Sequence, residues 1–192
     1  YNFECSTHTF MCNWIPTHNC DPYDDDGSGT MSLGSILVMD FWTDRVVAEY
    51  TGRKPFADSF YEVIRLLCIY YNCKALYENN LKGVFSYFSM RNCTHLLANT
   101  PEYLRDKQLI TTIGHGNKSK GVRATSPIIK FGFRLIRDWL LKPVTKIEKS
   151  AEGDEIEVSV PNLYYIRNRA LLKELIQWNP YGNYDRVMAL VQ

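Results

Sequence analysis

The sequence predicts a mixed α/β fold, with one β-sheet flanked by helices, and three observations indicate it. First, two apolar runs, 32–39 and 45–50, are separated by a turn at 43–44, as in a β-hairpin. Second, apolar residues recur every three to four positions over 57–71, which is typical of a helix. Third, the short run 74–77 indicates another strand, so strands and helices alternate along the chain.

The composition agrees with a globular domain. The chain has 192 residues, of which 45% are hydrophobic and 22% are charged, so we expect a single domain over 1–192 with a sizeable core. No apolar run approaches the roughly 20 residues that a membrane-spanning helix needs, so a membrane is not an expected partner. No charged-then-apolar leader opens the chain, so secretion is not indicated.

We expect residues 1–20 to be an irregular N-terminal segment. The run 10–15 has the apolar character of a short strand, but 16–20 is polar where a strand leading to Asp21 should be apolar. The segment also contains cysteines and histidines, at Cys5, His8, Cys12, His18 and Cys20. Their spacing matches no standard zinc finger, so we interpret the six cysteines of the chain as reduced core residues of a cytosolic protein.

Beyond residue 80, the pattern alternates again. A helix is predicted over 81–90 and a strand over 95–98. A long helix is predicted over 126–141, where one face is apolar and another is basic. The apolar face consists of Ile129, Phe133, Ile136 and Leu140.

The C-terminal part predicts a hairpin and two helices. Residues 144–160 alternate around Glu152-Gly153-Asp154, which indicates a β-hairpin. A helix follows over 164–178 and is broken by 179–182. The last helix is expected to begin near Asn183 as its N-cap and to bury Val187, Leu190 and Val191.

An acidic stretch precedes the first predicted hairpin. Four carboxylates fall within six residues, at Asp21, Asp24, Asp25 and Asp26. Carboxylates this close repel one another and resist ionisation unless a cation compensates them, and Mg²⁺ prefers oxygen ligands of this kind. The alternative interpretation is a solvated acidic loop.

Two further carboxylates stand at element boundaries. Glu78 follows the predicted strand 74–77, and Asp185 lies in the first turn of the last helix. Taken singly, Glu78 is equally well a surface residue and Asp185 a helix-capping acid. Together with Asp21, they predict a site for phosphodiester hydrolysis by two metal ions, one of which lowers the pKa of the attacking water while the other stabilises the leaving oxygen.

The charge is unevenly distributed, although the net charge is only +1. No Lys or Arg precedes Arg45, whereas 114–149 contains nine basic residues and two acidic ones. A basic surface beside an acidic pocket is expected of a metal-dependent enzyme that acts on a polyanion. The candidate residues for binding the polyanion are Lys118, Lys120, Arg123, Lys130, Arg134 and Arg137.

Five short motifs together resemble the nuclease domain of the terminase large subunit of tailed bacteriophages, the motor that packages the viral genome. They are DPYD at 21–24, TMSLGS at 30–35, AEYTGR at 48–53, YENN at 77–80 and NYDRVMAL at 183–190. The resemblance implies a ribonuclease H-like mixed sheet flanked by helices. Asp21 would lie on its opening strand, Glu78 on its fourth strand and Asp185 on its last helix. The hairpin at 144–160 would be the auxiliary β-hairpin that the family carries near its active site.

The same resemblance implies an activity and its partners. It implies a nuclease that depends on two Mg²⁺ or Mn²⁺ ions and cuts concatemeric double-stranded DNA during genome packaging in the host cell cytoplasm. It also implies the terminase ATPase domain, the small terminase subunit and the portal as partners. The ATPase domain itself is expected to be absent, because the spacing Gly29 to Gly34-Ser35 lacks the Lys of a phosphate-binding loop.

Two positions and two alternatives remain open within this interpretation. Met188 stands where many members carry a second acid, so Asp185 is the single candidate in the last helix. Asp25 or Asp26 is expected to add a metal ligand, with Asp26 preferred. The alternative functions are another ribonuclease H-like nuclease, of the resolvase or integrase type, and a non-catalytic DNA-binding module.

Overall fold

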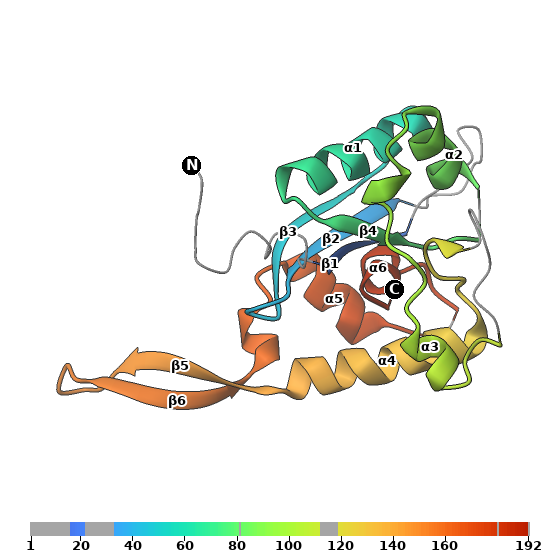
Figure 1. The fold of residues 1–192 in the computed structure, drawn as a ribbon. Helices are drawn as coiled ribbons and strands as arrows, with labels where there is room; N and C mark the ends of the chain where they lie inside the picture. Colours follow the sequence, from blue (N-terminus) through green and yellow to red (C-terminus); the bar gives the residue numbers. More distant parts are fainter. Residues whose placement is uncertain (1–15, 22–32, 81, 112–118, 180, 192) are drawn as a thin grey trace, which may run out of the picture.

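The fold is a mixed α/β arrangement, as the sequence predicts. A computed structural model describes residues 16–21, 33–80, 82–111, 119–179 and 181–191. A four-stranded sheet lies between two groups of helices, and a two-stranded hairpin projects from this body (Figure 1). Helices α1 and α2 lie on one face of the sheet, and α4, α5 and α6 lie on the other (Figure 1).

The central sheet has the strand order β3-β2-β1-β4. Strand β1 pairs antiparallel with β2 and parallel with β4, and β2 pairs antiparallel with β3. The hairpin predicted from the runs 32–39 and 45–50 and the strand predicted over 74–77 are therefore both confirmed. The bounds are β1 Pro16–Asp21, β2 Gly34–Asp40, β3 Arg45–Gly52 and β4 Lys74–Tyr77.

The expectation of an irregular segment over 1–20 is wrong for residues 16–20, which belong to β1. This strand lies in the interior of the sheet, and its backbone pairs with β2 on one side and β4 on the other. Backbone pairing on both sides satisfies its peptide groups, so the strand forms although its sequence is polar. The apolar run 10–15 lies outside the described residues.

Helix α1 (Ala57–Tyr70) covers one face of the sheet through the predicted apolar stripe. Phe60 and Ile64 are fully buried in a cluster with Ile36 of β2 and Tyr77 of β4. Burial of apolar surface stabilises the folded chain by about 25 cal/mol for each Å² removed from water. The helix is thereby fixed across the strands that carry the candidate site.

A polar contact joins α1 to α2 (Gly83–Met90). The Glu62 carboxylate accepts hydrogen bonds from Arg65 and, at 2.7 Å, from the Tyr87 hydroxyl. The hydrogen bonds from Arg65 are the main cause that lowers the pKa of Glu62 to about 2. Glu62 is therefore charged in neutral solution and holds the two helices together.

The predicted strand over 95–98 is wrong in most of its length. Residues Thr94–Leu96 form a 3-10 turn (η2), closed by bonds from the Leu96 and Leu97 amides to Cys93 and Thr94. Within the described residues 95–98, one β-bridge forms, between Leu97 and Ala75 of β4. The turn takes up the backbone groups that a strand would need for pairing. A short helix that the sequence analysis does not predict, α3 (Tyr103–Asp106), follows.

Helix α4 (Ser126–Leu141) has the predicted bounds and lies across the opposite face from α1. It approaches α6 (Asp185–Val191) closely at Gly132. A Cβ atom at this position would lie 2.6 Å from the Val191 carbonyl oxygen, so only glycine permits this packing. The predicted burial of Val187, Leu190 and Val191 is confirmed.

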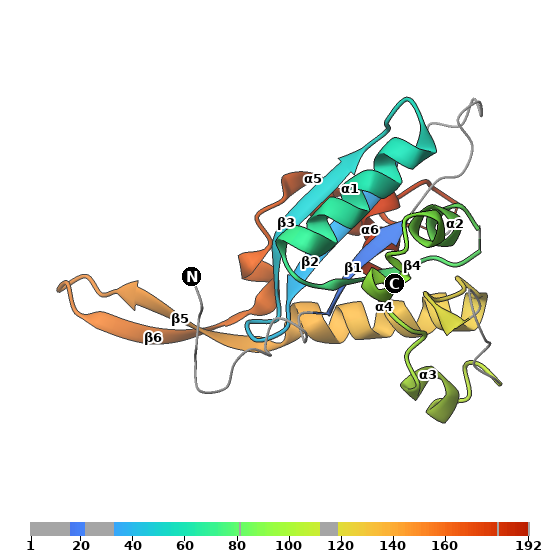
Figure 2. The same cartoon turned by 45° about the horizontal axis from the view of Figure 1, so that its top comes forward.

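The hairpin predicted over 144–160 is confirmed as β5 (Pro143–Lys149) and β6 (Glu155–Pro161), but it does not lie near Asp21, as the resemblance implied. Its base is fixed to the β2–β3 turn: Lys142 Nζ donates to Asp44 Oδ2 at 2.8 Å. That turn lies at the end of the sheet where β1 begins, whereas Asp21 lies at the other end. Figure 2 shows the hairpin projecting away from the end toward which β1 points.

The helix predicted over 164–178 begins later than expected. A 3-10 turn, η4 (Asn162–Tyr165), comes first, and α5 extends over Arg169–Gln177. Asn168 sets the start, because its Oδ1 accepts hydrogen bonds from the amides of Ala170 and Leu171 at 2.6 and 3.0 Å. A side chain that accepts from the first-turn amides is a helix N-cap.

Three of the cysteines that we expect to be reduced core residues are described with their side chains. Cys68, Cys73 and Cys93 are buried and form no disulfide. Among the described residues, no helix combines the length and the apolar character needed to cross a membrane.

Candidate acidic site at the end of the sheet

Asp21 and Glu78 lie at the same end of two neighbouring parallel strands. In the register of β1 and β4, Cys20 stands opposite Tyr77, and Asp21 and Glu78 are the residues that follow this pair. Carboxyl ends of parallel neighbours meet at one edge of a sheet, so the topology brings these two positions together.

The backbone around Glu78 is held by the segment before α4. The Val122 amide donates to the Tyr77 carbonyl at 2.9 Å, and the Asn79 amide donates to the Val122 carbonyl at 2.8 Å. Glu78 itself forms a parallel bridge with Val122. Its side chain is half-buried and accepts a hydrogen bond from the side-chain amide of Asn80. The position of Glu78 is thus fixed on both sides of its own strand.

Asp185 reaches the same end of the sheet from α6. Its side chain is buried, with 6% of the residue exposed, and Oδ2 accepts a hydrogen bond from the Leu33 amide at 3.0 Å. Leu33 directly precedes β2, and Ser35 of β2 pairs with Asp21. Helix α6 also packs against both β1 and β2. The three predicted catalytic positions therefore belong to two parallel strands and one helix and lie at the same end of the sheet.

Two first-turn amides of α6 donate to a carboxylate other than Asp185. The first-turn amides of Arg186 and Val187 donate to Glu174 Oε2 of α5, at 2.9 and 3.3 Å. Asn183, the expected N-cap, instead donates through its side chain to Asp185 Oδ2 at 3.5 Å. The Glu174 carboxylate thus satisfies the amides of Arg186 and Val187. Sequence reasoning missed Glu174, because no local pattern links α5 to α6.

The donor set fits a hard divalent cation as far as the side chains are described. Glu78 and Asp185 supply carboxylate oxygens, which are the ligands that Mg²⁺ and Mn²⁺ take. The structure describes Asp21 through its backbone, and the predicted additional ligand Asp26 lies outside the described residues. Within the described part of the chain, no group of three or more His, Cys, Asp and Glu side chains is placed to hold a metal ion.

The predicted basic residues fall into different environments. Lys120 donates through Nζ to the Leu97 carbonyl at 2.9 Å, and burial, with a smaller contribution from Lys74, lowers its pKa. This contact holds the 119–122 segment in place, so Lys120 supports the position of Glu78. Arg123 is exposed, and Lys118 lies outside the described residues.

The basic stripe of α4 faces solvent, as predicted. Lys130, Arg134 and Arg137 are all exposed, and Arg137 forms an ion pair with Asp138 at 2.8 Å. The helix begins at Ser126, a short distance along the chain from Val122, which pairs with Glu78. The stripe therefore starts near the end of the sheet that carries the acids.

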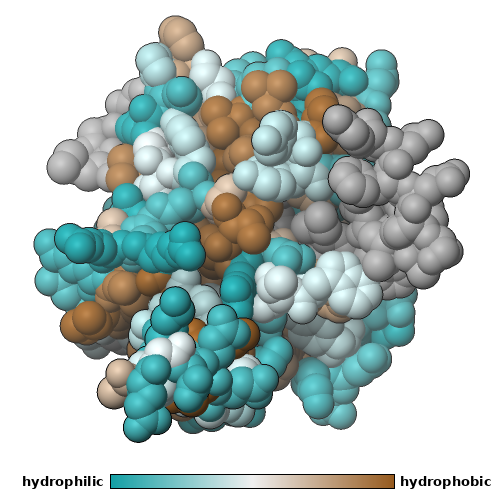
Figure 3. Space-filling view, turned by 90° about the vertical axis from the view of Figure 1, so that its left-hand side faces the viewer, coloured by the Kyte–Doolittle hydropathy of each residue, from teal (hydrophilic) through white to brown (hydrophobic). Residues whose placement is uncertain are grey.

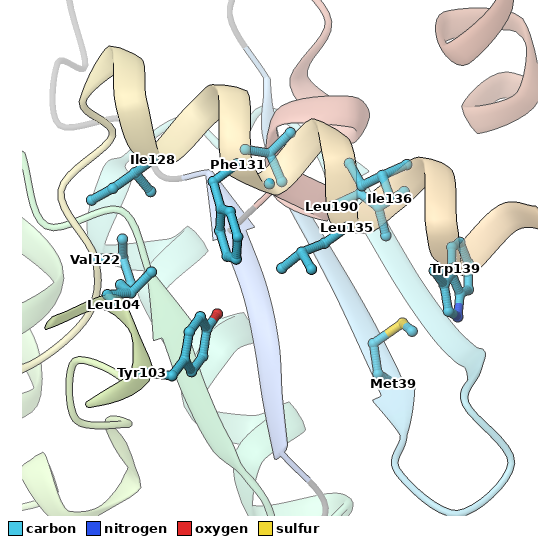
Figure 4. A pocket seen from close by; sticks show the side chains of 12 residues that line it. Met39, Tyr103, Leu104, Val122, Ile128, Phe131, Leu135, Ile136, Trp139 and Leu190 are labelled. Carbon is cyan, nitrogen blue, oxygen red and sulfur yellow. The ribbon is translucent and has the colours of Figure 1, made fainter. Parts of the chain in front are cut away.

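The apolar cavity beneath α4 is separate in its chemistry from this site. It has a volume of about 180 Å³. Figure 4 shows Phe131 and Leu135 of α4 facing Tyr103 and Leu104 of the α3 region across it. Its lining contains no carboxylate or imidazole.

Exposed apolar side chains also lie around the base of the hairpin. They include Phe41 and Trp42 of the β2–β3 turn and Leu141 at the end of α4. Figure 3, which views the side from which the hairpin projects, shows apolar areas among polar ones. This turn is at the opposite end of the sheet from Asp21.

Comparison with protein-family models, curated proteins and solved structures finds no match to the chain.

Proposed function

We propose that the chain is a metal-dependent DNA endonuclease with a ribonuclease H-like sheet. The observation that carries the proposal is the convergence of Asp21, Glu78 and Asp185 at one end of the sheet. These residues are far apart in sequence, and each lies where an element begins or ends. Their placement at the same end of the sheet supports a shared role more than it supports three separate solvated acids.

The topology supports the ribonuclease H-like assignment. Three antiparallel strands are followed by a helix and by a fourth strand that pairs parallel with the first. This is the arrangement in which an opening strand, a fourth strand and a final helix each contribute one acid. Helices cover both faces of the sheet. The ends of β1 and β4 and the start of α6 lie together at the end of the sheet that carries the acids.

The acids would hold the metal ions, and the neighbouring contacts would orient the acids. Asp21, Glu78 and Asp185 are the proposed ligands, with Asp26 as an additional one. When bound, two divalent ions lower the pKa of the attacking water and stabilise the leaving oxygen. The Leu33 amide fixes one oxygen of Asp185, and Asn80 bonds to Glu78, so both carboxylates are oriented before substrate arrives.

The proposed substrate is double-stranded DNA. Lys130 and Arg134 on the exposed face of α4 provide charge for the phosphate backbone without reading its sequence. More specifically, we assign the chain to genome packaging as a terminase-like nuclease that acts with an ATPase domain, a small terminase subunit and a portal in the host cell cytoplasm. This finer assignment rests on the motif resemblance, and the position of the hairpin departs from it.

Plasmid cleavage tests the proposal. The wild-type chain should nick and linearise supercoiled plasmid with Mg²⁺ or Mn²⁺ and should be inactive in EDTA. The substitutions Asp21→Asn, Glu78→Gln and Asp185→Asn should each abolish cleavage, because each removes one charged ligand and keeps the shape of the side chain. The matched control is Glu155→Gln on the exposed hairpin, which should cut like the wild type.

The same assay separates the alternatives. A resolvase-type enzyme would cut branched junctions in preference to linear duplex. A non-catalytic binding module would retain DNA in EDTA and never nick the plasmid. Wild-type cleavage by any of the three acid variants would remove that residue from the site.

A further inference from the structure

Glu174 makes three contacts with the start of α6. It lies on α5, and its side chain is mostly buried, with 17% exposed. Oε2 accepts hydrogen bonds from the amides of Arg186 and Val187, and Oε1 forms an ion pair with Arg186 Nη1 at 2.6 Å. One carboxylate thus contacts both the backbone and the side chain of the turn that contains Asp185.

These contacts bear on the hydrogen bonds that are open to the Asp185 carboxylate. An acid in the first helical turn ordinarily accepts from amides of that turn, because the helix dipole favours negative charge there. In α6, Glu174 already occupies two of these amides. The Asp185 carboxylate instead accepts from Leu33, at the end of the sheet.

The ion pair has a second electrostatic effect. Arg186 directly follows Asp185, although neighbouring side chains on a helix do not face each other. Its guanidinium is bound to Glu174, and its side chain is only 21% exposed. The pair also neutralises Glu174, so this fourth carboxylate adds little net negative charge near the site.

We propose that Glu174 is a positioning residue of the acidic site, which acts through Asp185 by capping α6 and retaining Arg186. The proposal rests on the proposed function for its metal, but the orientation of Asp185 can be measured without one. Residues that orient metal ligands typically change metal affinity about 10–100-fold when they are replaced.

The experiment compares the wild type, Glu174→Ala, Asp185→Ala and the control Glu155→Gln, each as the full chain. Nuclear magnetic resonance follows the Leu33 amide without metal, and calorimetry gives the dissociation constant of Mn²⁺. In Glu174→Ala, the Leu33 resonance should move toward its position in Asp185→Ala, while the Ile36 amide inside β2 stays in place. The Mn²⁺ dissociation constant should rise about 10–100-fold. Glu155→Gln should change neither quantity.

A second variant of Glu174 keeps the test decisive. If Glu174→Ala does not fold, Glu174→Gln, which keeps the shape and one acceptor oxygen, should show smaller changes in the same directions. A purely stabilising role would lower the melting temperature but leave the Leu33 amide and the Mn²⁺ affinity unchanged, and that result would overturn the proposal. A wild-type chain that binds no Mn²⁺ would overturn the proposed function, whereas a shift of the Leu33 amide would still support the link between Glu174 and Asp185.

Discussion

Gly121 is the residue on which the position of Glu78 most directly depends. It has a φ of +69°, a region that side chains rarely adopt, and a Cβ atom there would lie 2.5 Å from the Tyr77 carbonyl oxygen. The same segment supplies Val122, which pairs with Glu78. The sequence shows only that a glycine follows a basic loop. The close approach to Tyr77 depends on the tertiary fold.

We therefore expect Gly121→Ala to lower the free energy of unfolding by about 1–3 kcal/mol, the usual cost of a strained backbone, with contact strain in addition. The matched control is Gly153→Ala in the hairpin turn, where φ is also positive, at +94°, but no atom lies within 4 Å of the added Cβ. Urea denaturation of both variants measures the difference. Equal losses would show that Gly121 matters only for its backbone conformation.

At the residue scale, the sequence located the acids but not their supports. Glu78 and Asp185 could be predicted because each stands next to a regular periodic element. Glu174 and Lys120 could not, because their partners, Arg186 and Leu97, lie on other elements and no local pattern records them. Contacts of this kind follow from the packing of helices and strands and not from spacing along the chain.

At the element scale, α4 combines two faces with different roles. One face carries Ile128, Gly132 and Ile136 into the core, and the other presents Lys130 and Arg134 to solvent. Both faces follow from the helical period, which explains why its bounds could be predicted. The exposed stripe begins near the acidic end of the sheet, so a duplex lying along α4 would reach the proposed metal ligands.

Replacing Lys130 and Arg134 with Gln should weaken DNA binding alike for all sequences. The slope of log affinity against log salt should flatten by up to about 0.9 for each lost phosphate contact. Fluorescence anisotropy at several salt concentrations measures the slope. The control removes the same charge from exposed positions of the α3 region, as Arg105→Gln with Lys107→Gln. An equal slope in both double variants would place α4 away from the duplex.

Elements with weak periodicity were harder to predict. The motif resemblance implied an opening strand at Asp21, but the polar residues 16–20 did not indicate β1 by their pattern, and only pairing with β2 and β4 defines it. The strand expected over 95–98 is a 3-10 turn with a single bridge to Ala75. In both cases, backbone hydrogen bonds that form only in the folded chain decide the outcome.

At the scale of the whole molecule, topology determines which groups meet. Alternation of residues predicts the β5–β6 hairpin but contains no information about the end of the sheet to which it attaches. Lys142 and Asp44 settle that question by joining its base to the β2–β3 turn. The three acids, by contrast, come to the same end of the sheet only when β1, β4 and α6 have all assembled. Any cation that they bind would therefore bind the folded chain alone.

This coupling predicts how metal changes stability. An ion that binds only the folded state adds RT ln(1 + [L]/Kd), about 2.7 kcal/mol at a hundredfold excess over Kd. For a chain of this length, Mn²⁺ should raise the melting temperature by about 5–10 °C, since 1 kcal/mol corresponds to about 2–4 °C.

Without metal, like charges at the site oppose folding, so Glu78→Gln and Asp21→Asn should be as stable as the wild type or more stable. Both variants should lose most of the rise with Mn²⁺, whereas Glu155→Gln should retain it. Melting curves of the four proteins in EDTA and in Mn²⁺ measure both effects, and an equal rise in all four would mean that the ion binds elsewhere.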